Sequence, residues 1–167
     1  MTDHDAFDAM MDSVDSTVYL VTAAAGGERS GCLVGFATQI SIEPLRFLVG
    51  ISKANHTHGV AAAADHLAVH VVGREHMDLV RLFAGETGDE IDKFAHCDWH
   101  EGPHGLPILS DAGIWFAGRV VDRVEFGGDH TGYLLEPDGG EVLDRREARG
   151  TWAGLADVDD VTPGHPS

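Results

Sequence analysis

The fold is decided by residues 31–57, which read GCLVGFATQISIEPLRFLVGISKANHT. The first part predicts a strand over residues 32–42, because β-branched and apolar residues predominate there. Its interior glycine, Gly35, predicts a bend or a point where another group approaches the backbone closely. The second part predicts a strand over residues 47–51, and its unbroken apolar run predicts burial on both faces. A polar loop, residues 52–57, follows this strand.

Outward from this stretch, strand-like and helix-like segments follow one another in a particular order. β-branched and aromatic runs predict further strands over residues 17–22, 67–72, 114–126 and 131–135. Apolar residues at helical spacing predict short helices over residues 3–11, 60–65 and 77–83, and residues 97–107 are expected to form an irregular loop. Strands come first, then a helical insertion, then a strand hairpin. This order favours a mainly β fold, a β-barrel or sandwich with peripheral helices, over an alternating α/β sheet.

Length and net charge limit the classes of protein to which this chain can belong. The 167 residues are enough for one domain, expected over residues 1–153, with a loosely ordered tail over residues 154–167. Lys and Arg number 11 against 28 Asp and Glu, which gives a net charge of −17. A field of this sign repels phosphate backbones and anionic lipids, so we expect neither nucleic acid nor a membrane as a partner.

The cysteine count and the N-terminus bear on the compartment. Two cysteines, Cys32 and Cys97, are too few for a disulfide framework. No apolar run approaches the length of a membrane span, and the acidic N-terminus lacks the basic and apolar regions of a signal peptide. A reducing cytoplasm is therefore the expected location.

The polar loop is the first candidate site. It carries two hydroxyls, an ammonium, an amide and an imidazole, from Ser52, Thr57, Lys53, Asn55 and His56. The loop precedes a helix, so free backbone N–H groups add to these donors and a single phosphate could bind there. Helix capping by Asn55 or Thr57 explains the same residues. The sequence alone leaves both interpretations open.

Two glycine-containing stretches give further candidates. Gly35 would allow a flat aromatic ligand to lie against the strand backbone, although a bend in a barrel requires a glycine equally. Gly128-Asp129-His130 lies in the tight connection between the last two strands. His130 could donate a hydrogen bond or a proton near neutral pH, or it could simply follow a turn aspartate at the surface.

Histidines also raise the question of a metal. His96, Cys97 and His100 could supply three zinc ligands, but their spacing matches no known zinc finger. Chance clustering competes with this interpretation because the chain has 11 histidines, and we assign no metal site. His66 and His70 flank an expected strand and should point to one face of it, where we expect structural or surface roles.

Taken in order, these motifs resemble the flavin reductase family, whose members are FMN-binding split barrels. The resemblance runs from Tyr19 to Leu135, most of the domain. It is carried by Tyr19-Leu20-Val21-Thr22-Ala23, the second strand from Gly31 to Pro44, the loop from Ser52 to Thr57, and Gly128-Asp129-His130. GCLVGF and SKANHT, with TGDE at residues 87–90 and DKF at residues 92–94, are similar to one branch of the family.

The resemblance implies a homodimer with FMN, or FAD in its place, in a cleft at the dimer interface. It places the backbone of the second strand against the flavin ring, the hydroxyls and amide of the loop on the phosphate with a lysine lending charge, and a catalytic histidine near the nicotinamide. The implied cofactor-binding residues are Leu33, Val34, Gly35, Phe36, Gln39, Ser52, Lys53, Asn55, His56 and Thr57, and the implied catalytic residue is His130.

The implied activity is that of an NAD(P)H:FMN reductase, in which a hydride passes from NADH or NADPH to the flavin. Relatives often supply reduced flavin to a separate monooxygenase, so such a partner is expected. The alternative is a non-catalytic protein that binds flavin, deazaflavin or haem in the same barrel. Residues 33–36 replace the family's T-A-N-S, so ring contacts are expected from the backbone. The charge of −17 disfavours the extra phosphate of NADPH.

Overall fold

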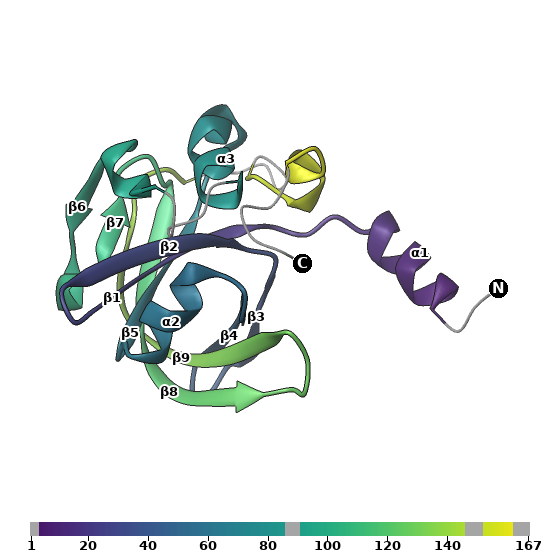
Figure 1. Ribbon diagram of the computed structural model, residues 1–167, viewed down its shortest axis with the longest axis horizontal. Helices are drawn as coiled ribbons and strands as arrows, with labels where there is room; N and C mark the ends of the chain where they lie inside the picture. The colour runs from purple at the N-terminus through teal and green to yellow at the C-terminus, as the bar shows by residue number, and fades with distance from the viewer. Residues whose placement is uncertain (1–3, 86–90, 146–151, 162–167) are drawn as a thin grey trace.

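The computed structural model describes residues 4–85, 91–145 and 152–161, and its centre is one curled antiparallel sheet (Figure 1). The sheet has seven strands in the order β2-β1-β5-β8-β9-β4-β3. Their bounds are β1 Tyr19–Ala25, β2 Glu28–Val34, β3 Phe36–Ser41, β4 Arg46–Ser52, β5 His66–Val71, β8 Ile114–Glu125 and β9 His130–Val142. The prediction of a mainly β barrel with peripheral helices is confirmed.

The curl of the sheet follows from the way its two edges are joined. The edge strands are β2 and β3, and only Gly35 separates them in the chain. One continuous segment therefore runs from one edge of the sheet to the other, and the sheet must curl to allow it. The bend predicted at Gly35 is confirmed, and it divides the single strand expected over residues 32–42 into two.

Two hydrophobic clusters lie on opposite faces of the sheet. Side chains alternate along β1, so Val21 and Ala23 enter the cluster inside the barrel, whereas Leu20 enters the cluster on the outer side. Helix α2, His56–Ala62, contributes to the inner cluster, and Figure 1 shows it inside the curl of the sheet. Helix α3, Met77–Gly85, covers the outer cluster.

Strand β4 differs from the sequence-based expectation. Burial on both faces was expected, but only Val49 and Ile51 are fully buried, whereas Leu48 and Gly50 are partly exposed. The apolar run is interrupted by the glycine, and the face that carries Leu48 and Gly50 borders an open cleft. An antiparallel sheet can leave one face uncovered in this way. This exposed face becomes part of the candidate site.

The segments around the outer cluster also contain more regular structure than expected. Residues 97–107 are not one irregular loop, because β6, Trp99–Glu101, pairs with β7, Pro107–Leu109, around the 3-10 turn η3, Pro103–Gly105. The hairpin strand expected over residues 131–135 continues to Val142 in β9. Short 3-10 turns also occur at η1, Arg74–His76, and η2, Lys93–Ala95.

The helix near the N-terminus and the described C-terminal segment differ in how they pack. Helix α1, Asp5–Ser13, has no buried residue. The tail expected from residue 154 is described as far as residue 161, where η4, Leu155–Val158, packs Leu155 and Val158 against the outer cluster. The domain boundary at residue 153 stays a prediction, and residues 162–167 lie outside the described part. Among the described residues, no helix is both long and apolar enough to cross a membrane.

His70 is a structural residue of β5, one of the two roles expected for it. Its ring is fully buried between the two neighbouring segments. The Nδ1–H group donates to the Leu20 carbonyl at 2.8 Å, and the Leu109 N–H group donates to Nε2 at 3.2 Å. Acceptance at Nε2 requires the neutral ring, and burial lowers the pKa of His70 to about 4.

This neutral ring predicts a loss of stability in mild acid. Between pH 6.5, the ordinary pKa of the group, and about 4, the unfolded chain binds a proton that the folded chain does not. The free energy of unfolding should therefore decrease as the pH is lowered from 6.5 to about 4. This group contributes up to roughly 3 kcal/mol to the decrease. Urea unfolding across the window measures the fall. An NMR titration in which the His70 ring of the folded protein protonates near its ordinary pKa would contradict the account.

Candidate functional site

An apolar cleft of about 280 Å³ opens where β3, β4 and the turn between β8 and β9 meet. It is lined by Phe36, Ala37, Thr38, Leu48, Gly50, Phe126 and His130. A Cβ atom on Gly50 would lie 3.3 Å from both the Cβ and the carbonyl oxygen of Phe36, so the glycine keeps this floor free of a side chain. A bare strand flanked by aromatic rings suits a flat, apolar ligand.

His130 forms one wall of this cleft. Its ring centroid lies 4.8 Å from that of Phe36, with the planes tilted by 60°. Its Nδ1 lies 2.8 Å from a carboxylate oxygen of Asp129, and this hydrogen bond lowers the pKa of Asp129. With Nδ1 held by the aspartate, Nε2 is the ring nitrogen available for a ligand.

The polar loop and the His130 turn are joined by hydrogen bonds. Ser52 is the cross-strand partner of His130 in the β4–β9 pair. The Lys53 backbone N–H donates to the Asp129 carbonyl at 2.9 Å, and Lys53 Nζ donates to the Gly128 carbonyl at 2.9 Å. Two motifs more than 70 residues apart in the chain therefore meet at the cleft.

Lys53 also forms an ion pair at this place. Its Nζ lies 2.7 Å from Glu125 Oε2, and both side chains are largely exposed. The hydrogen bond from Lys53, followed by one from Thr131, lowers the pKa of Glu125. Exposed ion pairs of this kind contribute little to stability, so an incoming anion can compete with the glutamate for the lysine.

The remaining loop residues point elsewhere. Asn55 Oδ1 accepts a hydrogen bond from the Thr57 N–H group at 2.9 Å, so the capping interpretation is confirmed for Asn55. The Thr57 hydroxyl is fully buried, 2.8 Å from the Ser30 hydroxyl. His56 lies 2.6 Å from Glu28 and lines a separate cavity of about 150 Å³. Phosphate binding by these three residues stays a prediction.

The second strand contributes less to the cleft than its sequence suggested. Val34 is buried in the inner cluster, and Leu33 packs against the outer cluster. A Cβ atom on Gly35 would lie 3.0 Å from Leu155 Cδ2, so this glycine faces the C-terminal segment. Gln39 is exposed and donates through its side chain to the Ser41 carbonyl. Of the second-strand residues expected to bind the cofactor, Phe36 is the one that lines the cleft.

Five residues of the cleft were not among the predicted site residues: Ala37, Thr38, Leu48, Gly50 and Phe126. A glycine in the middle of an apolar strand is a recognised sign of close backbone approach, and Gly50 carries that sign. Phe126 lies over Gly132, because a Cβ atom there would come within 2.6 Å of its ring. No local sequence signal identifies this contact.

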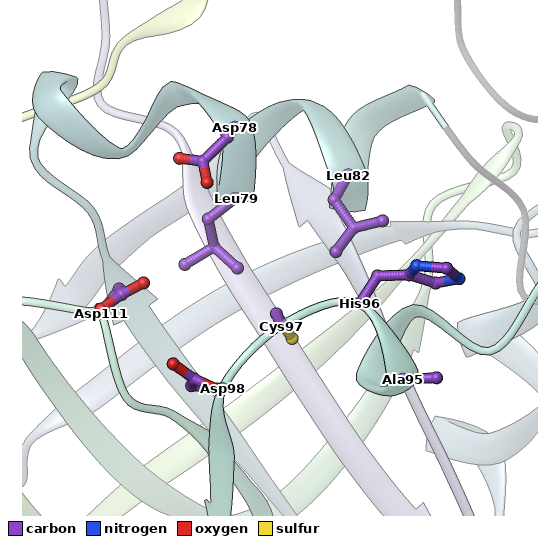
Figure 2. A pocket seen from close by; sticks show the side chains of 8 residues that line it. All are labelled: Asp78, Leu79, Leu82, Ala95, His96, Cys97, Asp98 and Asp111. Carbon is purple, nitrogen blue, oxygen red and sulfur yellow. The ribbon is translucent and has the colours of Figure 1, made fainter.

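A second and larger cavity, of about 510 Å³, lies between α3 and the segment after η2 (Figure 2). The carboxylates of Asp78, Asp98 and Asp111 lie at one end of it, and His96 lies at the other. This acidic lining disfavours any ligand that carries phosphates. A phosphate-bearing cofactor therefore fits the apolar cleft better than the larger cavity.

The three zinc ligands considered from the sequence, His96, Cys97 and His100, do not come together in the described structure. His96 and Cys97 line the acidic cavity, whereas His100 lies on β6. Over the described ranges, these three residues are not among the groups of donors that lie within 4.8 Å of one another. Burial, followed by the charges of neighbouring aspartates, raises the pKa of the Cys97 thiol to about 11, and burial does the same for Cys32. Neither cysteine is a thiolate nucleophile at neutral pH.

Comparison with known proteins identifies similar sequences. The family described as "Flavin reductase like domain" matches residues 11–155. A stretch of 141 residues is 30% identical to the reductase component of 4-hydroxyphenylacetate 3-monooxygenase from Pseudomonas aeruginosa, covering 84% of this chain and 82% of that protein. A stretch of 132 residues is 30% identical to the stachydrine N-demethylase reductase subunit Stc3 from Rhizobium meliloti, covering 75% of this chain. The chain spans only 56% of the length of Stc3.

Solved structures show the same fold. The NADH:FAD oxidoreductase SgcE6 from Streptomyces globisporus superposes with a TM-score of 0.74 at 25% identity, covering 84% of this chain and 83% of that one. The flavin reductase HpaC, solved with NADP+, superposes with a TM-score of 0.75 at 20% identity, covering 91% of this chain and 97% of that one. At that identity, the second likeness bears on the fold alone.

Proposed function

The chain belongs to the flavin reductase-like family, and on this premise we propose that it is an NAD(P)H-dependent flavin reductase. The proposed reaction is the transfer of a hydride from NADH or NADPH to FMN, with FAD as an alternative acceptor. The observation that carries the proposal is the apolar cleft in which the rings of Phe36 and His130 flank the bare strand at Gly50, next to the loop that carries Lys53. The names of two relatives, a monooxygenase reductase component and an NADH:FAD oxidoreductase, support it.

The residues of the cleft fit a flavin. Gly50 leaves a surface that a Cβ atom would fill, and the Phe36 ring beside it offers a face for stacking. Ser52 and the Lys53 ammonium lie at the polar edge of the cleft, where they can bind a phosphate. The flavin, when bound, supplies the hydride-accepting ring, and the chain supplies its position.

His130 positions the second substrate in this proposal. Asp129 holds its ring through Nδ1, and the ring packs against Phe36 in the wall of the cleft. A nicotinamide carries an amide that can bond to the remaining ring nitrogen. Hydride transfer requires two rings in close, aligned contact, so a residue that orients one of them raises the rate.

A second copy of the chain completes the cleft in this proposal. One chain provides about 280 Å³, slightly less than the 300 Å³ or so at the lower end of complete ligand sites. Large apolar side chains are exposed along the cleft and along β3 and the turn after it: Phe36 by 64%, Ile40 by 52%, Ile42 by 80% and Phe126 by 61%. Exposed large apolar side chains in such number favour association, and we infer a homodimer.

Three finer points complete the proposal. The net charge of −17 repels the additional phosphate of NADPH, so NADH is the preferred donor. The name of the Pseudomonas relative supports a monooxygenase as the consumer of the reduced flavin. The two cysteines are free, as expected of a protein in the reducing cytoplasm.

The proposal is tested by mixing the purified chain with FMN under anaerobic conditions and adding NADH. Bleaching of the flavin absorption band well above the protein-free rate is the expected result. A perturbed flavin spectrum without bleaching by NADH or NADPH would contradict the reductase and favour a non-catalytic flavin-binding protein. An unperturbed spectrum would contradict flavin binding itself.

A further inference from the structure

Three side chains of the kinds that bind metals converge outside the cleft, and none of them has a part in the proposed reaction. They are His66 at the start of β5, His104 in η3, and Asp138 in β9. Their donor atoms all lie within 4.8 Å of one another, and among the described residues no other group of three such donors does. The three residues come from three separate segments, so only the fold brings them together.

The two distances from the Asp138 carboxylate to the histidines match those between neighbouring ligands of a tetrahedral ion. Asp138 Oδ2 lies 3.2 Å from His66 Nε2 and 3.3 Å from His104 Nε2. Zinc bonds to nitrogen and oxygen of about 2.0–2.1 Å place neighbouring ligand atoms about 3.3 Å apart in a tetrahedron. The carboxylate oxygen therefore already lies at ligand spacing from both imidazole nitrogens.

Two of the ligands are held by unusual backbone. His104 has φ of +58°, the one non-glycine residue with positive φ in the described chain. Asp138 is the extra residue of a β-bulge, because Ala117 pairs with Gly139 whereas Gly118 pairs with Pro137. Bulges and left-handed residues re-aim side chains at a cost in backbone energy. Here both features direct a side chain to the same point.

The exposure of the group leaves room for a further ligand. The side chains are exposed by 17% at His66, 42% at His104 and 32% at Asp138, so water can complete a four-coordinate shell. Arg119, the cross-strand partner of His66, is paired with Glu136 at 3.4 Å.

The two imidazole rings are stacked, with centroids 3.5 Å apart and planes 8° from parallel. The nitrogen lone pairs of two stacked rings point in parallel directions and do not converge on one ion. A shared ion therefore requires His104, the more exposed ring, to rotate.

We propose that His66, His104 and Asp138 form a binding site for a divalent transition-metal ion of the zinc type. Two imidazoles and one carboxylate are ligands that Zn²⁺ accepts, with one position left to water. The ion would join β5, the η3 turn and β9, and so anchor the β6–β7 hairpin to the barrel. The proposal does not depend on flavin or on reductase activity.

Zinc titration of the full chain, first freed of metal with a chelator, tests the proposal. One Zn²⁺ ion per chain and a raised midpoint of thermal unfolding are expected for the natural sequence. His104→Asn should weaken the affinity at least ~10-fold, the lower end for loss of a metal-site interaction. Asparagine tolerates positive φ, so this variant keeps the turn. Asp138→Asn should weaken binding similarly.

The matched control is His96→Ala, which removes an exposed histidine from the acidic cavity of Figure 2 and should leave zinc binding unchanged. Cobalt substitution provides a second readout, since a tetrahedral site gives intense visible absorption bands that His104→Asn should abolish. Natural affinity in both ligand variants, loss of affinity in His96→Ala, or no binding at millimolar zinc would each overturn the proposal.

Discussion

Leu48→Glu is expected to weaken flavin binding strongly while leaving the fold intact. Leu48 is partly exposed in the apolar cleft, so a carboxylate there remains hydrated in the free protein. A bound ring would strip that water from the charge, and the charge would also repel the flavin phosphate. The dissociation constant for FMN should rise by ~100-fold or more, a loss of about 3 kcal/mol. Quenching of FMN fluorescence measures it.

Leu143→Glu provides the control, because Leu143 is 52% exposed and lies outside the cleft. This variant adds the same charge to an already acidic chain and should bind FMN as the natural sequence does. Equal losses in the two variants would mean that overall charge, and not the cleft, governs affinity. Unchanged affinity in Leu48→Glu would remove the cleft from the binding site.

His130→Phe is expected to slow reduction of bound flavin by NADH without loss of flavin binding. The phenyl ring preserves the packing against Phe36, whereas the hydrogen bond to Asp129 and the free ring nitrogen are lost. Loss of a hydrogen bond that orients a reacting ring should lower the rate by ~10- to 100-fold, equivalent to about 1.4–3 kcal/mol. Anaerobic stopped-flow absorbance gives the rate and the flavin affinity separately.

His130→Ala separates the hydrogen-bonding role of the ring from its packing role, because it also removes the surface that packs against Phe36. We expect it to match the reduced rate of His130→Phe and, in addition, to weaken FMN binding. His100→Ala, at an exposed histidine on β6, should change neither quantity. A natural rate in His130→Phe would demote His130 to a packing residue.

The parts of the fold that depend on local patterns could be predicted from the sequence. Gly35 marks the bend between β2 and β3, and Gly128-Asp129 marks the connection before β9. The pairing order could not be read this way, because it depends on contacts between strands far apart in the chain. The 97–107 segment was misjudged for the same reason, since β6 is stabilised by β7 and not by its own propensity.

The motifs that form the site could be predicted from the sequence, but the individual residues that line the cleft could not. The loop from Ser52 and the turn at His130 were both singled out, and the β4–β9 register brings them together. Thr57 and Val34 look equivalent to their neighbours in sequence, yet the barrel buries both. Leu48 and Phe126 looked like ordinary apolar residues, because exposure at a cleft is a property of the folded surface. The same limit concealed the grouping of His66, His104 and Asp138, which no sequence spacing connects.

The most direct test of the central claim is a crystal structure of the chain grown with FMN. The account predicts the flavin ring in the cleft, in contact with Phe36, Gly50 and His130, with its phosphate beside Lys53 and a second copy of the chain covering the opposite side. A flavin ring in the acidic cavity beside Cys97, with the Phe36 cleft filled only by solvent, would contradict it.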